Sequence, residues 1–299
     1  MSKSIRLFLT GFGMGTADII PGVSGGTMAF IFGIYEELLD SIKKATGEAP
    51  KMLFKGKVKD AYKTVPWAFL LPVSGGIFSA ILLLSNLLSF LLDTQATFVR
   101  SFFFGLVLAS GYIVSRRVKV WTISNVISMI VLFVGAFELV GLIPVSTPEI
   151  YLAFFLSGAL AICAMILPGI SGAFILVLLG KYDQVLNAVV HLDIVILLLV
   201  MGGAVLGLAM FSRVLSWLFA KHHDLTVAGL TGLMLGSIRK LWPWKEVLQT
   251  GIDRHGEIVI LQDSNILPKT IDVSVIAVLL LVTLGIVLLI KLSSFNRDK

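Results

Sequence analysis

A polar, helix-breaking stretch stands between two apolar runs near the start of the chain. Its residues are Pro21, Gly22, Val23, Ser24, Gly25, Gly26 and Thr27. Proline lacks a backbone donor and disfavours helix at the residue before it, so a helix from Ile5 should end near Ile20. Ser24 is a good N-cap for a second helix, whose start would carry roughly half a positive charge. The stretch therefore predicts an anion site at a helix break.

The same pattern returns 147 positions later, in Pro168, Gly169, Ile170, Ser171 and Gly172. Flanking residues match on the same offset: Gly11 with Gly158, Gly33 with Gly180, Tyr35 with Tyr182, and Glu36 with Asp183. Paired helix breaks in two similar halves are typical of transporters built from repeats. In such proteins the substrate site lies where the broken helices meet.

The composition indicates a membrane protein, because 57% of the residues are hydrophobic and only 14% are charged. A net charge of +6 can indicate nucleic-acid binding, but here seven lysines gather between residues 43 and 63, beside apolar helices. Membrane lipids explain that charge better than nucleic acid. The single Cys163 excludes an internal disulfide and a thiolate metal cage, so we expect neither a metal nor a cofactor.

The arms that follow the breaks are too short to cross a bilayer. Val23 to Tyr35 spans about 20 Å as helix and Ile170 to Leu179 about 15 Å, against roughly 30 Å of hydrocarbon. We therefore expect two re-entrant hairpins with their tips near mid-membrane. Irregular backbone at that depth must face protein or water.

We predict an all-α polytopic membrane protein made of two inverted-topology repeats, each a re-entrant helical hairpin plus three transmembrane helices. The first repeat (1–145) contains the hairpin 5–42 and helices 65–92, 97–115 and 120–143. The second (146–299) contains the hairpin 149–190 and helices 194–219, 225–241 and 271–290. The lysine-rich loop 43–63 and both termini should be cytoplasmic. We predict that the stretch 243–268 lies outside, and we assign no function to it.

Charge balance requires a cation or a proton, because two helix starts supply about one positive charge and a phosphate monoester carries about −1.5 to −2. Arg100 is the predicted cation, although it could equally snorkel to the interface. The predicted substrate-binding residues are Asp18, Pro21, Gly22, Ser24, Gly25, Gly26, Thr27, Arg100, Pro168, Gly169, Ser171 and Gly172.

Three carboxylates are candidates for proton linkage: Asp18, Glu36 and Asp183. Asp18 precedes the first break by three residues, and capping of the break is its favoured role over proton transfer. Glu36 and Asp183 occupy matching places in the two halves. The simpler explanation for both is solvation at the membrane interface.

The motifs resemble a known family. Gly-Met-Gly-Thr-Ala-Asp (13–18) before the first break, and Leu-Pro-Gly-Ile-Ser-Gly (167–172), are similar to those of the polyprenyl-phosphate transporter (PopT) family. The resemblance implies a non-enzymatic flippase of the bacterial inner or plasma membrane. Such a protein returns undecaprenyl phosphate, the cell-wall lipid carrier, from the outer to the inner leaflet and draws on the proton gradient. It leaves open whether the chain forms a homo-oligomer.

Two other functions remain open at this point. Integral-membrane undecaprenyl-diphosphate phosphatases also have inverted repeats, with a PG-x-S-R-S-x-x-T motif. This chain has Gly25 where that motif has arginine, and it lacks the Glu-Glu-x-x-x-Glu stretch of those enzymes. An anion channel or anion transporter with facing helix starts also fits the local physics, but not a lipid-sized substrate.

Overall fold

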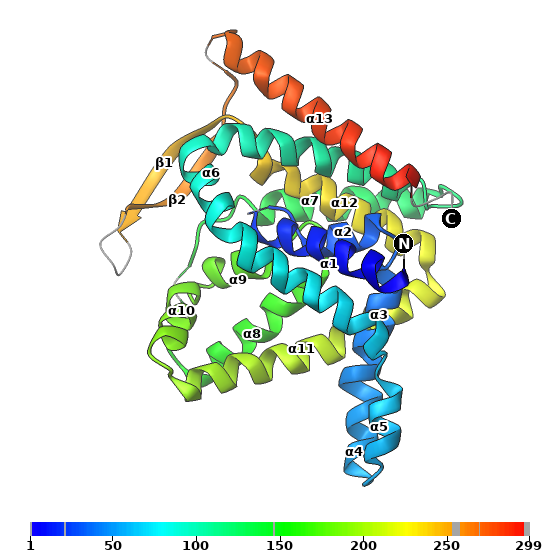
Figure 1. The fold of residues 1–299 in the computed structure, drawn as a ribbon. Coiled ribbons are helices and arrows are strands. Elements are labelled where there is room, and N and C mark those ends of the chain that lie inside the picture. Colours follow the sequence, from blue (N-terminus) through cyan, green and yellow to red (C-terminus); the bar gives the residue numbers. More distant parts are fainter. Residues whose placement is uncertain (1, 21, 146, 253–257, 269, 296–299) are drawn as a thin grey trace.

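The structure is a computed structural model that describes residues 2–20, 22–145, 147–252, 258–268 and 270–295. The first half contains α1 (Lys3–Ile19), α2 (Gly25–Ile31), α3 (Tyr35–Lys43), a π-helical turn (Lys44–Glu48), α4 (Ala49–Phe54), α5 (Val58–Thr64), α6 (Trp67–Ser115) and α7 (Ile123–Leu139). The second contains α8 (Tyr151–Ile166), α9 (Gly172–Leu178), α10 (Tyr182–Val190), α11 (Ile194–Lys221), α12 (His223–Leu241), β1 (Lys245–Ile252), β2 (Ile258–Asn265) and α13 (Val273–Phe295) (Figure 1).

Several helices are long and apolar, as expected for a multi-pass membrane protein. In the described part of the chain, α6, α11 and α13 are long and apolar enough to cross a bilayer. This is fewer separate helices than predicted, in part because α6 runs through both predicted helices, 65–92 and 97–115. Non-helical backbone at Gln95 (φ −136°, ψ 37°) divides α6 into two arms. Both α7 and α8 are apolar but shorter.

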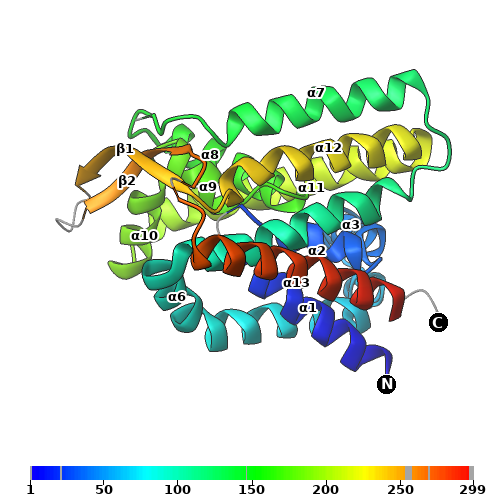
Figure 2. The same ribbon diagram turned by 90° about the horizontal axis from the view of Figure 1, so that it is seen from above.

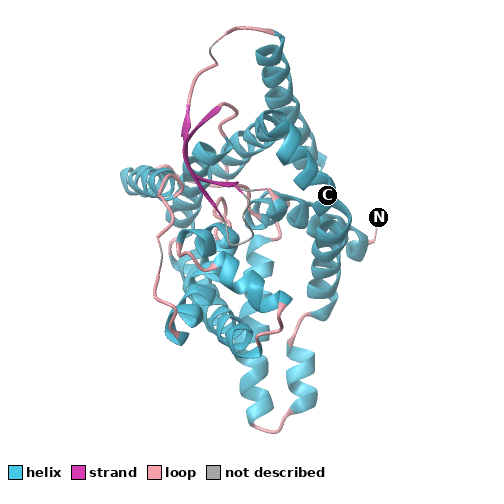
Figure 3. Ribbon diagram, turned by 90° about the vertical axis from the view of Figure 1, so that its left-hand side faces the viewer, coloured by secondary structure: helices cyan, strands magenta, loops and turns pink. Residues whose placement is uncertain are grey.

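Two regions differ from the predicted all-α fold with a lysine-rich loop. The predicted loop 43–63 is helical instead, and α4 and α5 project from the rest of the molecule (Figure 1). The stretch left without a function forms an antiparallel β hairpin, in which β1 pairs with β2 (Figure 3). Trp242 Nε1 donates to the carbonyl of Ile266 at 2.7 Å, and Asn265 Nδ2 donates to that of Arg239 at 3.0 Å. The hairpin is thereby fixed to the end of α12.

In both halves the chain returns, after its break, to the end at which it entered. Lys3 Nζ at the start of α1 lies 3.5 Å from Glu37 Oε1 in α3. In the second half, Thr147 Oγ1 just before α8 donates to the carbonyl of Leu179, after α9, at 2.7 Å. Figures 1 and 2 show that the starts of α1 and α3 lie at one end of the molecule and α10 at the other, together with the β hairpin.

Small residues bring the helices into close contact in a matching pattern. Gly11 of α1 lies so near the carbonyl of Val73 in α6 that an added Cβ would overlap it, and Gly158 of α8 does the same with Val200 in α11. Beyond these pairs the halves exchange partners. The second arm of α6 packs on α13, and α12 packs on α7 (Figure 2). Each half therefore completes the packing of the other.

Candidate anion site between two helix breaks

The first break is capped by two side chains of its own hairpin. One carboxylate oxygen of Asp18 accepts a hydrogen bond from the N–H of Gly25 at 2.7 Å, and Ser24 Oγ accepts from that of Gly26 at 3.1 Å. Asp18 therefore has the capping position that the sequence favoured for it. The first N–H groups of α2 are already satisfied inside the protein. The sequence suggested that these N–H groups are open donors for an anion. In the structure they are not, because each already has an acceptor within the protein.

The second break lies directly against the first. Ser24 Oγ donates to the carbonyl of Leu167 at 3.2 Å, and Tyr35 Oη donates to that of Ile166 at 3.1 Å. A Cβ added to Gly26 would stand 2.6 Å from the carbonyl oxygen of Ile166, so only glycine fits there. The first hairpin thus satisfies carbonyl groups that become free where α8 ends.

The two breaks have the same backbone geometry. Gly22 has φ +91° and Gly169 has φ +95°, and the glycines after the short helices, Gly33 and Gly180, have φ +75° and +63°. These angles lie in the left-handed region, which residues with a Cβ occupy only at a cost. Both breaks also begin a helix of seven residues. No side chain of the described residues caps α9, in contrast to α2.

A cavity of about 340 Å³ lies between the breaks. Its lining includes Asp18 and Gly22 from the first break, Gly169 and Ser171 from the second, and Lys240 from the last turn of α12. Apolar residues make up most of the rest and extend toward Leu142, Pro144 and Tyr182. A mostly apolar cavity with a few convergent polar groups is typical of a small-molecule site, and Lys240 in its lining favours an anionic group.

Further positive charge surrounds Asp263 of the β hairpin, beside the cavity. Lys245 Nζ lies 2.8 Å from one carboxylate oxygen of Asp263, and Lys240 Nζ lies 3.7 Å from the other. Burial alone would raise the pKa of Asp263, but the Lys245 hydrogen bond and the charges of Lys240, Lys245 and Arg100 outweigh it and lower that pKa. Burial lowers the pKa of Lys245, and its bond to Asp263 opposes that change. Two lysines therefore pair with one carboxylate, and Arg100 adds to the positive charge around it.

Residues 14–259 match a family described as undecaprenyl phosphate translocase-like. The chain belongs to this family. It is 42% identical to the polyprenyl-phosphate transporter of Vibrio cholerae over 88% of this chain and 86% of that one. It is 32% identical to the polyprenyl-phosphate transporter of Staphylococcus aureus over 79% of this chain and 85% of that one. No solved structure matches the chain.

The predicted site residues of this translocase-like chain fall into distinct groups. Those that line the cavity are Asp18, Gly22, Gly169 and Ser171. Those that form the contacts within and between the breaks, or are buried there, are Ser24, Gly25, Gly26, Pro168 and Gly172. Arg100 belongs to the charged group around Asp263, Thr27 lines a different cavity, and Pro21 lies outside the described residues.

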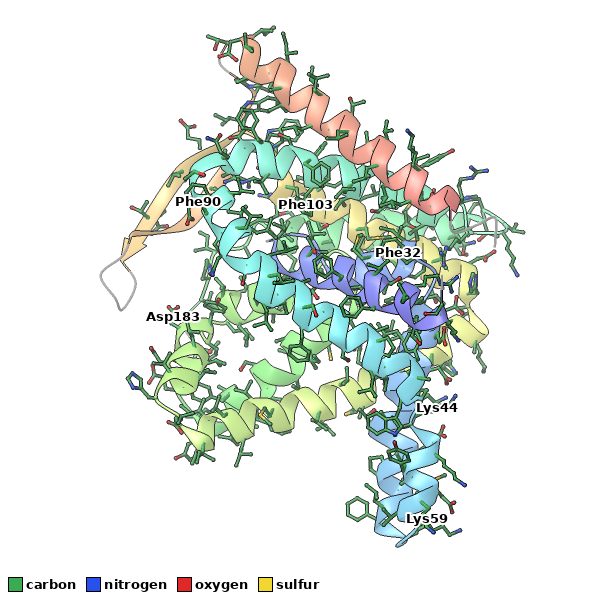
Figure 4. The ribbon with its side chains drawn as sticks, viewed as in Figure 1. Phe32, Lys44, Lys59, Phe90, Phe103 and Asp183 are labelled. Atoms are coloured by element: carbon green, nitrogen blue, oxygen red, sulfur yellow. The ribbon has the colours of Figure 1, made fainter. Side chains whose placement is uncertain are left out.

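Of the three candidates for proton linkage, one lines the cavity and two lie elsewhere. Asp18 lines the cavity, whereas Glu36 lies at the start of α3, 3.8 Å from His223 Nε2. Asp183 is exposed on α10 (Figure 4). Within the described ranges, no group of three or more His, Cys, Asp or Glu side chains is placed to hold a metal ion.

Sequence reasoning missed Lys240, Lys245 and Asp263. The only available signal was the basic pair Arg239-Lys240 at the predicted end of helix 225–241. Basic residues are common in the last turn of a helix, so this pair did not indicate a site.

The names of the family and of its relatives indicate a transporter and not an enzyme. The packing at the first break is consistent with the absence of the phosphatase motif's arginine at position 25. A Cβ added to Gly25 would stand 2.5 Å from a carboxylate oxygen of Asp18. An arginine at this position would displace the cap of α2. This translocase-like break is therefore built around the Asp18 carboxylate and not around a diphosphate-binding arginine.

Proposed function

We propose that this chain transports a polyprenyl phosphate, undecaprenyl phosphate in bacteria, from the outer to the inner leaflet of the inner or plasma membrane. Membership of the translocase-like family supports a polyprenyl-phosphate substrate. The observation that carries the location of the site is the single cavity lined by both helix breaks and by Lys240. The phosphate binds there, while the isoprenoid tail stays in lipid.

The charges around the cavity suit a phosphate monoester. Such a group carries about −1.5 to −2 near neutral pH. Lys240 supplies one positive charge in the lining, and Lys245 and Arg100 supply two more beside it, against the carboxylate of Asp263 beside the cavity and that of Asp18 in the lining. A phosphate that enters the cavity competes with Asp263 for Lys240, because both are anionic oxygen acceptors.

We place the molecule in the membrane as two inverted repeats with re-entrant hairpins. Matching glycine conformations, matching helix contacts and hairpins that close at opposite ends support this arrangement. Helices α2 and α9 each have seven residues, about 10 Å, and cannot span the bilayer alone. The lysine-bearing α4 and α5 are cytoplasmic, with both termini on the same side, so the β hairpin is outside. The cavity then receives substrate from the outer leaflet.

Transport is linked to protons in this proposal, and Asp18 is the group in the cavity that exchanges one. Protonation of Asp18 weakens its acceptance of the Gly25 N–H and reduces the negative charge that faces the substrate phosphate. Glu36 and Asp183 remain predictions for the two membrane surfaces, since neither lines the cavity.

The decisive experiment measures movement of a fluorescent polyprenyl phosphate in proteoliposomes. Lys240→Gln removes the cation that lines the cavity and should slow transport at least about tenfold, since a charge-assisted hydrogen bond contributes roughly 1.5–3 kcal/mol. Lys59→Gln is the matched control, because Lys59 is exposed on α5, far from the breaks (Figure 4). Equal rates for Lys240→Gln and the parent protein would reject this site.

A parallel assay separates transport from hydrolysis. Purified protein incubated with undecaprenyl diphosphate should release no inorganic phosphate. Release above that of a heat-inactivated sample would instead favour the phosphatase.

A further inference from the structure

Two further cavities lie along one seam of the molecule, between α1, α2, α6 and α13. The first measures about 230 Å³ and is lined by Arg6, Ile31, Phe32, Gly33, Ile113, Arg117 and Ser293. The second measures about 150 Å³ and has a mostly apolar lining from α1, α2, α6 and α13. We call them the arginine cavity and the apolar cavity. Figure 4 labels Phe32, from the arginine cavity, and Phe103 of α6, from the apolar one.

The two cavities are neighbours, because the same helices line both. Thr27 of α2 lines the apolar cavity, and Ile31, four residues later, lines the arginine cavity. The same spacing relates Leu289 to Ser293 on α13. Residues four apart on a helix lie on one face, about one turn or 5–6 Å along it. The pair therefore forms one continuous seam with a charged end and an apolar end.

The charged end suits a phosphate group. Arg6 comes from α1 and Arg117 from the turn after α6, where its guanidinium lies 5.1 Å from the ring centroid of Phe30. None of the described residues that line this cavity carries a carboxylate. Two guanidinium groups balance the −1.5 to −2 charge of a phosphate monoester, and their planar donors match phosphate oxygens.

The apolar end suits a hydrocarbon chain attached to that phosphate. Side chains of Phe102, Leu106, Val107 and Leu292 contribute to its lining. Thr27 Oγ1 is buried at this cavity and has no hydrogen-bond partner among the described residues. A free phosphate ion has no use for an adjacent apolar cavity, whereas a lipid phosphate fills both parts.

We propose that the arginine and apolar cavities together form a second binding site for a lipid phosphate. Arg6 and Arg117 hold the phosphate, and the first part of the tail lies between α2, α6 and α13. The inference rests on the proposed function for the identity of the lipid, a polyprenyl phosphate at the inner leaflet. Helix α2 then connects the two sites, since its start adjoins the cavity between the breaks and its end adjoins Arg117.

The test counts binding sites on the full chain in detergent by titration calorimetry, with farnesyl phosphate as the probe. The parent protein should bind two equivalents, and the double variant Arg6→Gln, Arg117→Gln only one. Lys240→Gln should also bind one, at the arginine site. Arg116→Gln is the matched control, because Arg116 neighbours Arg117 in sequence but does not line the cavity. It should retain both equivalents.

A second variant tests the same site independently, in case the double arginine variant does not fold. Leu292 lines the apolar cavity from a half-exposed position, so Leu292→Trp should fill the cavity with little damage to the core. It should weaken binding at the arginine site at least about tenfold and leave the other equivalent unchanged. Inorganic phosphate at the same concentration should not displace farnesyl phosphate from this site. Displacement at equal concentration would show a free-anion site and overturn the proposal.

The results separate the two proposals. Two equivalents in the arginine double variant, or a single parent equivalent lost only in Lys240→Gln, would reject the second site and keep the first. A single parent equivalent that is lost in the double variant and retained in Lys240→Gln would keep the second site and reject the first.

Discussion

The two helix breaks share a backbone geometry but differ in how the protein surrounds them. In α2, six of the seven residues are buried, whereas in α9 only Gly172 is. The first break is capped by Asp18 and Ser24, and the second has no side-chain cap among the described residues. Both breaks line the cavity, but the helix that follows the first break is part of the core, whereas the helix that follows the second is not.

This difference suggests which hairpin moves during transport. A segment with few buried contacts and uncapped ends costs less free energy to displace than one packed on all sides. Helices α9 and α10 meet at 108°, and Phe174 and Val177 of α9 line the cavity. We expect α9 and α10 to close over bound substrate, while α1 and α2 stay fixed.

The largest expected effect concerns the glycines at the breaks. Gly169→Ala places a Cβ 2.9 Å from the backbone Cα of Met234 and requires a left-handed conformation, so we expect loss of most folded protein. Gly22→Ala has similar strain, and its Cβ meets Lys240 Cβ at 3.0 Å rather than backbone atoms, so we expect a smaller loss of folded protein than for Gly169→Ala, with impaired transport. Fluorescence-detected size-exclusion chromatography with a thermal ramp measures this.

Gly56→Ala is the strain-only control for these glycines. Gly56 has φ +73°, and nothing lies within 4 Å of an added Cβ. Gly56→Ala should lower the free energy of unfolding by about 1–2 kcal/mol, because alanine is strained in the left-handed region. Equal melting temperatures for Gly169→Ala and Gly56→Ala would contradict the close contact between the second break and α12.

A smaller effect should distinguish the two caps. Ser24→Ala removes an N-cap and a hydrogen bond to Leu167, and should destabilise the protein by about 1–2 kcal/mol. Ser171→Ala at the equivalent position removes no cap hydrogen bond and should cost about 0.5 kcal/mol or less. Denaturant unfolding of both variants tests the asymmetry. Similar losses would show that the second break is also capped.

The smallest expected effect is on the pH dependence of transport. The pKa of Asp263 lies below its ordinary value of about 4, so the group is ionised from pH 5 to 8. Its stabilising interactions are present above that ordinary value and are lost only as the pH falls through the lower, folded pKa. Asp263→Asn should therefore change the rate but not the midpoint of the profile between pH 5 and 8.

Asp18→Asn provides the contrast to this last variant. In our proposal Asp18 carries the transported proton, so its substitution should flatten the pH profile in the same window. A midpoint that moves with Asp263→Asn and not with Asp18→Asn would place the proton step in the β hairpin.

Local sequence signals were sufficient for the breaks but not for their surroundings. Pro168, with Gly22 and Gly169, marked where helices end, because their backbone restrictions act within a few residues. The capping of Gly25 by Asp18 was a less certain inference, since it needs the chain to fold back across seven residues.

Long-range features were not predictable from the pattern. The β hairpin is held by contacts with the end of α12, and the role of Lys240 depends on which helices meet at the cavity. The lysine-rich stretch 43–63 was predicted to be a loop. Lysine is in fact a good helix former, and that local propensity is realised in α4 and α5.

The exchange of partners between the halves has a consequence for biosynthesis. Helix α7 leaves the ribosome long before α12, the helix on which it packs, and the second arm of α6 likewise waits for α13. Early helices must therefore persist in the bilayer with exposed interfaces until translation nears its end. Truncation after α12 should leave a product that membrane quality-control proteases recognise, even though both helix breaks have already been made.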